Sequence, residues 1–367
     1  MQNLRLIRLN VFNYKNLVQA SLSLHSKVNA FFGENAQGKT NFLDAIFTLG
    51  NTKSYLTSVD ADSVMAGEAF YTISTEVEKD NVLDEISIAY QIEGKKRVKK
   101  GVKDFKRLAD YIGYMPVVII SPYDSNIISG LAEIRRKFLD SAISFYNREY
   151  LTALMQYNKI LKQKNSHLKS EMPNAGVLEV LNVQLAKPGA YILKERQRFV
   201  DIFNPVFSTN YSDLAGVDES PELTYLPSIL PTEDYETALK NNMKREMMAR
   251  RSTLGIHKDD LDLKLKHLSA KKFASQGQQK SLLIALKLSK YLVLKDEIGV
   301  KPILLLDDIF DKLDKKRVQN LMDILHQEHY GQLFISHTSK EDILDIFGDD
   351  LGLFQVKNGK VSSDVEV

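Results

Sequence analysis

Residues 33–40 read GENAQGKT, which is the spacing of a phosphate-binding loop. In such a loop backbone N–H groups cradle the phosphates, Lys39 reaches the β and γ oxygens, and the Thr40 hydroxyl ligates Mg²⁺. An apolar strand pattern before the loop and a helix pattern after it agree with this interpretation and argue against a chance glycine-rich turn. Because Lys39 would touch the γ-phosphate, it is also a candidate catalytic residue. The residues predicted to contact the nucleotide are Gly33, Glu34, Asn35, Ala36, Gln37, Gly38, Lys39, Thr40 and Asn41.

A second run with residues that could take part in a reaction, ILLLDD, covers residues 303–308. Asp307 ends an apolar strand pattern and is placed to hold Mg²⁺ together with Thr40. Asp308 follows at once, where a group that activates or positions water near the γ-phosphate would stand, so it is the candidate catalytic carboxylate. The alternative is that both are ordinary solvated acids at a strand end. A phosphate-binding loop in the same chain makes this alternative less favoured.

The elements that must position these motifs follow from hydrophobic periodicity. The ranges expected to form strands are 4–12, 17–24, 27–33, two within 70–92, 114–122, 260–268 and 301–310. A helix is expected over 40–50, with Gly50 placed to end it.

The middle of the chain has a different character. From about residue 125 apolar residues recur three and four apart, which predicts helices over 134–169, 177–207 and 236–252. Pro188 and Gly189 inside the second pattern predict a break in that helix.

The simplest organisation is an α/β head formed by both ends of the chain, with a mainly helical arm domain inserted between them. The expected bounds are 1–120 and 252–367 for the head and 121–251 for the arm. A chain of 367 residues is long enough for both domains.

Composition excludes several kinds of site. The formal net charge is +2, so a nucleic-acid surface would have to be a local patch. There are no cysteines, which excludes disulfides, thiolate zinc sites and cysteine nucleophiles. The first residues have no apolar signal core, and no apolar run is long enough to span a bilayer, so we expect a cytoplasmic protein without a membrane partner.

A polar segment far from the phosphate-binding loop, FASQGQQKSL at 273–282, precedes an apolar helix pattern. A polar, glycine-containing helix start favours a docked anion. A phosphate-binding loop with a remote Ser-x-Gly-Gln motif resembles the ABC-type ATPases. That resemblance implies that the signature helix of one subunit caps the γ-phosphate bound by another, and therefore an ATP-dependent homodimer. The signature residues acting in trans would be Ser275, Gln276, Gly277, Gln278 and Gln279.

Two further segments extend this resemblance. The stretch Asp311 to Asp314 is similar to the D-loop that crosses the dimer interface, with Asp314 as the candidate contact. His337 follows an apolar strand pattern and resembles the switch histidine that contacts the γ-phosphate, whereas a lone histidine is usually structural. The resemblance makes His337 a third candidate catalytic residue.

The order of the motifs is similar to that of the RecF family of bacterial recombination and repair ATPases, over essentially the whole chain. The stretches that carry this resemblance are GENAQGKTNFLDAI at 33–46, IRRKFLD at 134–140, GIHKDDLDLKL at 255–265, ASQGQQK at 274–280 and LLLDDIFDKLD at 304–314. It implies an α/β ABC-type ATPase head similar to that of SMC proteins, with a short helical arm. ATP and Mg²⁺ are the implied cofactors, with ATP-dependent dimerisation on double-stranded or gapped DNA and slow hydrolysis that releases the dimer. RecR and RecO are the implied partners in loading RecA at single-strand gaps and stalled forks.

The chain departs from the family pattern at several positions. The arginine expected near the nucleotide is Lys15, which keeps the charge but loses the bidentate geometry. Residues 255–260 read GIHKDD where the family usually has Gly-Pro-His-Arg-Asp-Asp. Residues 121–124 read SPYD where it usually has Ser-Pro-Glu-Asp. No glutamine occurs between Gln91 and Gln156, so a Q-loop glutamine is not assigned.

The densest basic segment covers residues 93–107. Its side chains could contact DNA phosphates, which gives affinity that depends on salt and not on base sequence. The DNA-binding candidates are Lys95, Lys96, Arg97, Lys99, Lys100 and Lys103. A solvated hairpin tip is an equal alternative, and residues 243–251 are a weaker second candidate. Arg135 and Arg136 could serve the arm, the interface or nucleotide sensing.

Two other functions fit parts of the pattern. The chain could be the nucleotide-binding subunit of a membrane transporter, but such subunits usually carry Leu-Ser-Gly-Gly-Gln and lack so large a helical insertion. It could also be a nuclease-linked ATPase, for which one cluster of metal-ligating residue types is available. That cluster is His257, Asp259, Asp260 and Asp262, which we interpret as structural or interface residues.

Overall fold

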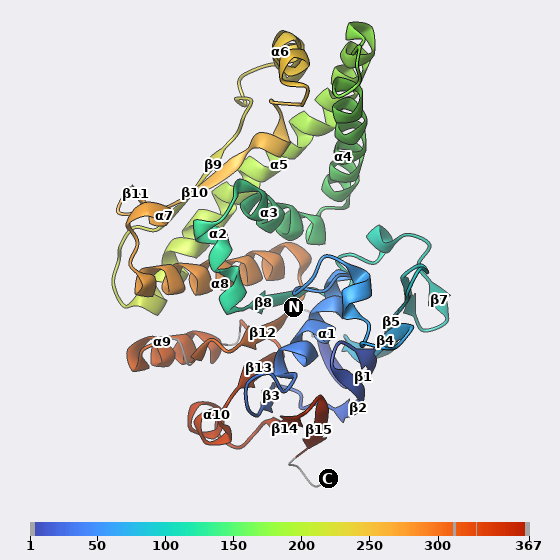
Figure 1. The fold of residues 1–367 in the computed structure, drawn as a ribbon. Helices are drawn as coiled ribbons and strands as arrows, with labels where there is room; N and C mark the ends of the chain where they lie inside the picture. Colours follow the sequence, from blue (N-terminus) through green and yellow to red (C-terminus); the bar gives the residue numbers. More distant parts are fainter. Residues whose placement is uncertain (1–3, 311–312, 328, 364–367) are drawn as a thin grey trace. The chain divides into compact units, whose positions relative to one another are not determined.

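A computed structural model describes residues 4–310, 313–327 and 329–363 of the chain (Figure 1). The chain divides into two compact units. The first unit consists of Met1–Asp124, Asp213–Gly216 and Ile284–Val367, and the second of Ser125–Ser212 and Val217–Leu283. The predicted head differs from the first unit mainly in residues 252–283. These residues lie in the second unit, where their strand β10 (Asp260–Leu265) pairs with β9 (Glu222–Leu226).

A mainly parallel sheet in the order β15-β14-β3-β13-β12-β8 forms one layer of the first unit. Its strands are β3 (Val28–Phe32), β8 (Val117–Ile120), β12 (Ile303–Asp307), β13 (Leu333–His337), β14 (Gly352–Lys357) and β15 (Lys360–Ser363). β15 pairs antiparallel with β14, and the other neighbours are parallel. β8, β12 and β13 are buried along their whole length, which is typical of parallel strands covered on both faces.

An antiparallel sheet in the order β2-β1-β4-β5-β6-β7 forms the other layer. Its strands are β1 (Leu4–Tyr14), β2 (Leu17–Ser23), β4 (Phe70–Lys79), β5 (Val82–Gln91), β6 (Arg97–Lys100) and β7 (Lys103–Asp104). Along β4 the more buried and less buried side chains alternate, because one face covers the core and the other faces water.

Helix α1 (Lys39–Asn51) contacts strands of both sheets (Figure 1). Its apolar side chains join the two sheets into one core. The prediction that Gly50 ends this helix is wrong, because Gly50 lies inside it. A Cβ at Gly50 would lie 2.4 Å from Cγ2 of Val117, so glycine allows α1 to pack closely on β8. The helix ends instead at Thr52, which has a left-handed φ of 59°. Helices α9 (Lys315–Leu325) and α10 (Lys340–Phe347) also belong to this unit.

The second unit is mainly helical and carries a three-stranded sheet in the order β11-β10-β9. Its remaining elements are α2 (Asn126–Ser129), α3 (Ala132–Tyr146), α4 (Arg148–Leu168), α6 (Tyr235–Ala249), α7 (Ala270–Phe273) and β11 (Leu268–Ser269). Two long helices, α5 (Ala175–Ala215) and α8 (Gln276–Ile298), contribute residues to both units.

The break predicted at Pro188 and Gly189 is wrong, because α5 runs through both residues. Gly189 packs against the ring of Tyr235, to which a Cβ would come within 2.4 Å, and this tertiary contact outweighs the local preference of the two residues. Among the described residues, no helix combines the length and apolar character needed to cross a membrane.

Candidate nucleotide-binding site

The sequence motifs of the first unit meet at the carboxyl edge of the parallel sheet. β3 leads into the phosphate-binding loop, β12 ends at Asp307, β13 ends at His337, and Ser121 follows β8. Because these four strands are parallel neighbours, their ends bring together residues that are far apart in the sequence.

The phosphate-binding loop has the backbone shape of an anion cradle. Gly33 and Gly38 have φ values of 144° and 115°, and a Cβ at Gly33 would lie 2.4 Å from the carbonyl oxygen of Val356. Lys39 is buried, and its Nζ donates to the carbonyl oxygens of Gly33 at 2.7 Å and Glu34 at 3.0 Å. α1 has no acidic residue in its first turn, so its N-terminal N–H groups are not compensated by the helix itself. These features fit the phosphates of ATP.

Other loop residues fasten the loop to its neighbours. The side chain of Gln37 accepts the N–H of Asn358 at 2.6 Å, and its carbonyl oxygen accepts the N–H of Gly359 at 2.9 Å. Nδ2 of Asn41 donates to Oδ1 of Asn16 at 2.7 Å. The exposed members of the loop are Glu34, Asn35 and Ala36. Direct contacts of these residues with a nucleotide stay predictions.

Asp307 is the centre of a cluster of hydroxyl groups. Its Oδ1 accepts hydrogen bonds from Oγ1 of Thr40 at 2.9 Å and Oγ of Ser336 at 2.7 Å, and its Oδ2 accepts one from Oγ of Ser121 at 3.1 Å. Burial raises the pKa of Asp307 above its usual value, and the three hydrogen bonds oppose that rise. A hydroxyl beside a carboxylate supplies the oxygen ligands that Mg²⁺ takes, so Thr40 and Asp307 fit the predicted metal pair.

Asp308 and His337 lie at the ends of neighbouring strands. Asp308 has a left-handed φ of 45°, and its backbone N–H donates to Oγ of Ser336 at 3.0 Å. His337 is buried, and its Nδ1 accepts the N–H of Ser339 at 3.1 Å, which leaves a ring proton on Nε2. The fold therefore fixes both residues, while their action on a γ-phosphate stays a prediction.

Lys15 is held by α1. Its Nζ lies 2.6 Å from Oδ2 of Asp44 and donates to Oγ of Ser54 at 3.2 Å. Asp44 is fully buried and also accepts hydrogen bonds from the hydroxyl of Tyr14 at 2.7 Å and the N–H of Tyr55 at 2.6 Å. Sequence reasoning missed this cluster. The nucleotide contact of Lys15 stays a prediction, and its ion pair with Asp44 also gives Lys15 a structural role.

Ser275 precedes helix α8 and forms a reciprocal pair of hydrogen bonds with Gln278. Oγ of Ser275 accepts the N–H of Gln278 at 3.2 Å, and Oε1 of Gln278 accepts the N–H of Ser275 at 2.8 Å, which is a capping box. Nε2 of Gln278 donates to Glu219 at 2.9 Å, and Nε2 of Gln279 donates to the carbonyl oxygen of Ala274 at 3.1 Å. The first turn of α8 has no acidic residue, so this helix start suits an anion. Its action on a second copy stays a prediction.

Asp314 caps helix α9. Its side chain accepts the N–H of Arg317 at 2.9 Å and pairs with Nη1 of Arg317 at 3.0 Å. The hydrogen bond from this backbone N–H lowers the pKa of Asp314. Capping gives Asp314 a structural role beside the predicted interface contact. The adjoining D-loop residues Asp311 and Lys312 lie outside the described residues.

Two of the DNA-binding candidates are engaged in ion pairs within the first unit. Lys96 has a buried side chain that pairs with Asp60 and donates to the carbonyl oxygen of Thr52 at 2.7 Å. Lys100 pairs with Asp84 at 2.8 Å. The Lys96 ammonium is buried in these contacts, which give it a structural role, whereas the Lys100 side chain is 34% exposed beside its ion pair.

The other basic residues of the segment divide between the two faces of β6. Arg97 and Lys99 are exposed on the face opposite the buried Val98, and Lys95 precedes them on the surface. Lys103 pairs in register with Lys100 on the other face. We define the exposed patch before and along one face of β6 as Lys95, Arg97 and Lys99. Contact of any of the six candidate residues with DNA stays a prediction.

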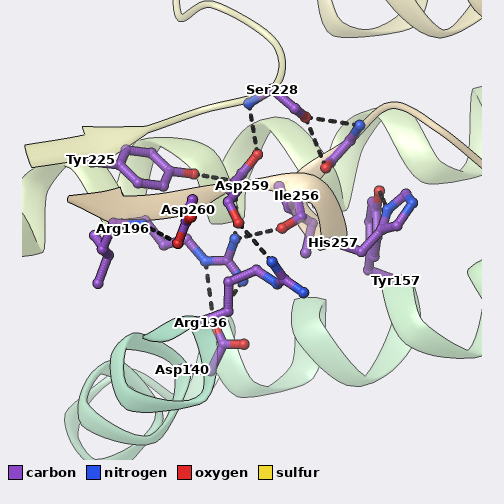
Figure 2. Close-up of polar contacts among 12 residues, drawn as sticks. Arg136, Asp140, Tyr157, Arg196, Tyr225, Ser228, Ile256, His257, Asp259 and Asp260 are labelled. Atoms are coloured by element: carbon purple, nitrogen blue, oxygen red, sulfur yellow. Dashed lines mark hydrogen bonds and ion pairs between the residues drawn. The ribbon is translucent and has the colours of Figure 1, made fainter. Parts of the chain in front are cut away.

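Figure 2 shows Asp259 and Asp260, two of the acidic residues considered for a nuclease, inside an arginine network of the second unit. Oδ2 of Asp259 accepts hydrogen bonds from Nη1 of Arg196 at 2.9 Å and from the hydroxyl of Tyr225, and Oδ1 accepts the N–H of Ser228 at 2.8 Å. Arg196 is 1% exposed, and its Nη2 donates to Asp140 at 2.8 Å. A buried guanidinium requires such partners, so Asp259 acts as its counter-ion.

Asp260 completes this network. Arg135 donates two hydrogen bonds to the carboxylate of Asp260, at 2.7 and 2.9 Å. Nη1 of Arg136 donates to the carbonyl oxygen of Asp259 at 2.7 Å (Figure 2). Within the described part of the chain, no group of three or more histidine or acidic residues is arranged to hold a metal ion. These contacts support the structural interpretation of the acidic cluster and place both arginines in the second unit.

Known proteins resemble this chain over most of its length. The sequence profile described as "RecF/RecN/SMC N terminal domain" matches residues 5–362. The DNA replication and repair protein RecF of Flavobacterium johnsoniae is 41% identical over 342 residues, which covers 92% of this chain and 95% of that protein. RecF of Bacteroides fragilis is 38% identical over 360 residues, with 97% of each chain covered.

Solved structures resemble the fold as well. A structure of the recombination mediator protein RecF with ATP, in the RecFOR pathway, matches with a TM-score of 0.90 at 30% identity and covers 99% of this chain and 98% of that one. The Smc head domain of Pyrococcus furiosus matches with a TM-score of 0.56 at 16% identity, over 99% of this chain and 96% of that one. The predicted fold class, an α/β ABC-type ATPase head, is confirmed.

Proposed function

The chain belongs to the RecF family of DNA replication and repair proteins, and from this premise we propose that it is an ATP-dependent DNA-binding protein that acts as a homodimer. The observation that carries the proposal is the 2.9 Å hydrogen bond between Thr40 and Asp307. It joins the phosphate-binding loop and the acidic strand end into one site with the oxygen ligands that Mg²⁺·ATP needs.

ATP binding would move Lys39 from the loop carbonyl oxygens onto the β and γ phosphate oxygens. Asp308 would position the attacking water, and the Nε2–H of His337 would contact the γ-phosphate. Magnesium, when bound, neutralises negative charge on the phosphates. The start of α8, with Ser275, would cap the γ-phosphate bound by a second copy, because its N–H groups and hydroxyl are suited to an anion. Dimerisation would then depend on ATP, and slow hydrolysis would reset it.

The biological role follows from the family. The ATP-bound relative is a recombination mediator of the RecFOR pathway, which supports RecR and RecO as partners of this chain too. We expect the dimer to bind double-stranded or gapped DNA in the cytoplasm and to help load RecA at single-strand gaps and stalled forks. The arginine partners of Asp259 and Asp260 argue against the nuclease alternative.

Sedimentation velocity of the full chain with fluorescent gapped duplex DNA tests this proposal. The variant Asp308→Asn removes the candidate catalytic carboxylate and is used to slow turnover. Asparagine is chosen because it tolerates the left-handed φ of 45° at this position. We expect a monomer without ATP, and a DNA-bound dimer with ATP and Mg²⁺. Asp323→Asn, at an exposed acid of α9, is the control that should keep full turnover. A monomer that responds to neither ATP nor DNA would contradict the proposal.

A further inference from the structure

The segment of residues 121–124 directly follows β8, the parallel neighbour of β12. The ends of two such strands share one edge of the sheet, and Oγ of Ser121 donates to Oδ2 of Asp307 at 3.1 Å. Thr40 and Ser336 both use the other carboxylate oxygen. Ser121 therefore fixes the second oxygen of the predicted magnesium ligand.

Ser121 is itself held in a closed turn. Its backbone N–H donates to Oδ2 of Asp124 at 3.0 Å, and the N–H of Asp124 donates back to the carbonyl oxygen of Ser121 at 3.0 Å. Ser121 is 1% exposed and Asp124 is 6% exposed, so water does not compete for these groups. The turn thus holds the serine hydroxyl on Asp307.

Asp124 ties this turn to helix α8. Its Oδ1 lies 2.6 Å from Nζ of Lys287, and the two side chains are 6% and 9% exposed. Nζ of Lys287 also lies 5.8 Å from the ring centroid of Tyr55. Removing two charges from water is costly, so a pair buried this deeply holds only with close and well-formed contacts. Lys287 belongs to the same helix whose first turn contains the signature residues.

We propose that Ser121 is a positioning residue of the magnesium site, and that the Asp124–Lys287 pair links this site to helix α8. This role rests on the proposed ATP site. The Ser121 hydroxyl donates its proton to Asp307 and keeps lone pairs that can accept a hydrogen bond from a metal-bound water. A metal ion bound at Asp307 would therefore change the hydrogen bonds of Ser121 and so the position of its turn. Asp124 and Lys287 would pass that change to α8.

The first test measures metal binding without turnover. Mn²⁺ is titrated into the full chain with ADP, and free Mn²⁺ is followed by electron paramagnetic resonance. Ser121→Ala is expected to weaken Mn²⁺ binding by about tenfold or more, as outer-shell partners of metal sites do, while ADP binding in EDTA is unchanged. Ser121→Thr, which keeps the hydroxyl, should restore Mn²⁺ binding, and Ser23→Ala, at an exposed serine of β2, is the matched control.

Mn²⁺ affinity within twofold of the unchanged protein in Ser121→Ala would overturn the positioning role. If the unchanged protein bound no ADP or ATP at all, the proposed function would fail instead, so the two failures are distinguishable.

The second test follows the link to α8 by hydrogen exchange. Asp124→Asn combined with Lys287→Gln removes both charges of this pair together. We expect this double variant to lose at least half of the protection that Mg²⁺·ATP gives to residues 276–283, and Lys287→Arg to keep it. Full protection in the double variant, or no protection in an unchanged protein that binds ATP, would overturn the link.

Discussion

Thr40 and Asp307 are separated by 267 positions in the sequence, yet the Thr40 hydroxyl donates a hydrogen bond to Asp307 at 2.9 Å. The contact joins the first turn of α1 to the last residue of β12. The fold itself therefore holds the phosphate-binding loop and the predicted metal ligands in one geometry, and pre-organisation of this kind reduces the entropy lost when a ligand binds.

Lys39→Met should remove most of the affinity for ATP. Methionine has a similar length but no charge, and a hydrogen bond to a charged group contributes about 1.5–3 kcal/mol, so the dissociation constant should rise at least about tenfold. Isothermal titration calorimetry with ATP measures it. Lys53→Met, at an exposed lysine, should bind ATP like the unchanged protein. Equal affinity in the two variants would contradict the assignment of the loop.

The central motifs of the site could be predicted from the sequence because each is local. The phosphate-binding loop and the pair Asp307 and Asp308 have a fixed spacing beside an apolar strand pattern. Ser121 and Ser336 could not be predicted, since their contacts with Asp307 depend on β8 and β13 lying on either side of β12. The available signal was a polar residue at the end of each buried strand.

Local rules failed where packing overrides them. Gly50 looks like a helix end, but it is the position where α1 approaches Val117 of β8. Charge density in residues 93–107 fits either a DNA-binding surface or a solvated hairpin tip, and it does not show how strand alternation and ion pairs divide the basic side chains. Lys96, for example, is bound to Asp60. The wrong helix end at Gly50 and the division of the basic segment both come from contacts between residues that the sequence does not place side by side.

Ser275→Ala should leave ATP binding intact and prevent ATP-dependent dimerisation. The hydroxyl would be needed only at the nucleotide of a second copy, and its loss should reduce the dimer population at least about tenfold. Sedimentation velocity with ATP in the Asp308→Asn background measures this.

The loss of the Ser275 cap alone costs about 1 kcal/mol of stability and needs its own control. Asp234→Ala removes an N-cap of the same kind from α6, where the side chain of Asp234 accepts the N–H of Thr237 at 2.8 Å. This variant should still dimerise with ATP. Normal dimerisation of Ser275→Ala would show that the signature does not act in trans.

Replacing Lys95, Arg97 and Lys99 with alanine should weaken DNA binding and make it less dependent on salt. Each DNA phosphate that the protein no longer neutralises lowers the slope of log affinity against log salt by about 0.9, so the slope of the triple variant should fall by up to about 2.7. Fluorescence anisotropy with duplex DNA at several salt concentrations, with ATP present, gives the slope. The matched control replaces three exposed lysines of the second unit, Lys159, Lys162 and Lys169. An unchanged slope in the first variant would identify the hairpin as ordinary solvated surface.

His257 should make the second unit less stable in mild acid. Burial lowers the pKa of His257 from 6.5 to about 4, and its Nε2 finds no hydrogen-bond partner among the described residues. Between pH 6.5 and pH 4 the unfolded chain therefore binds a proton that the folded protein does not. The free energy of unfolding should fall as the pH drops through this window, by about 2 kcal/mol from this group between pH 7 and pH 5.

His257→Gln isolates this contribution, because carboxylates such as Asp260, whose pKa is lowered by Arg135, also destabilise the protein at acid pH. Urea unfolding of both proteins at pH 7 and pH 5 gives the two differences, and that of His257→Gln should be smaller by about 2 kcal/mol. Tyr157→Phe removes the hydroxyl 3.2 Å from Nδ1 but keeps the buried imidazole, so it should retain the pH dependence. If His257→Gln keeps the same dependence as the unchanged protein, the imidazole is not held neutral by burial, and the acid sensitivity belongs to the carboxylates.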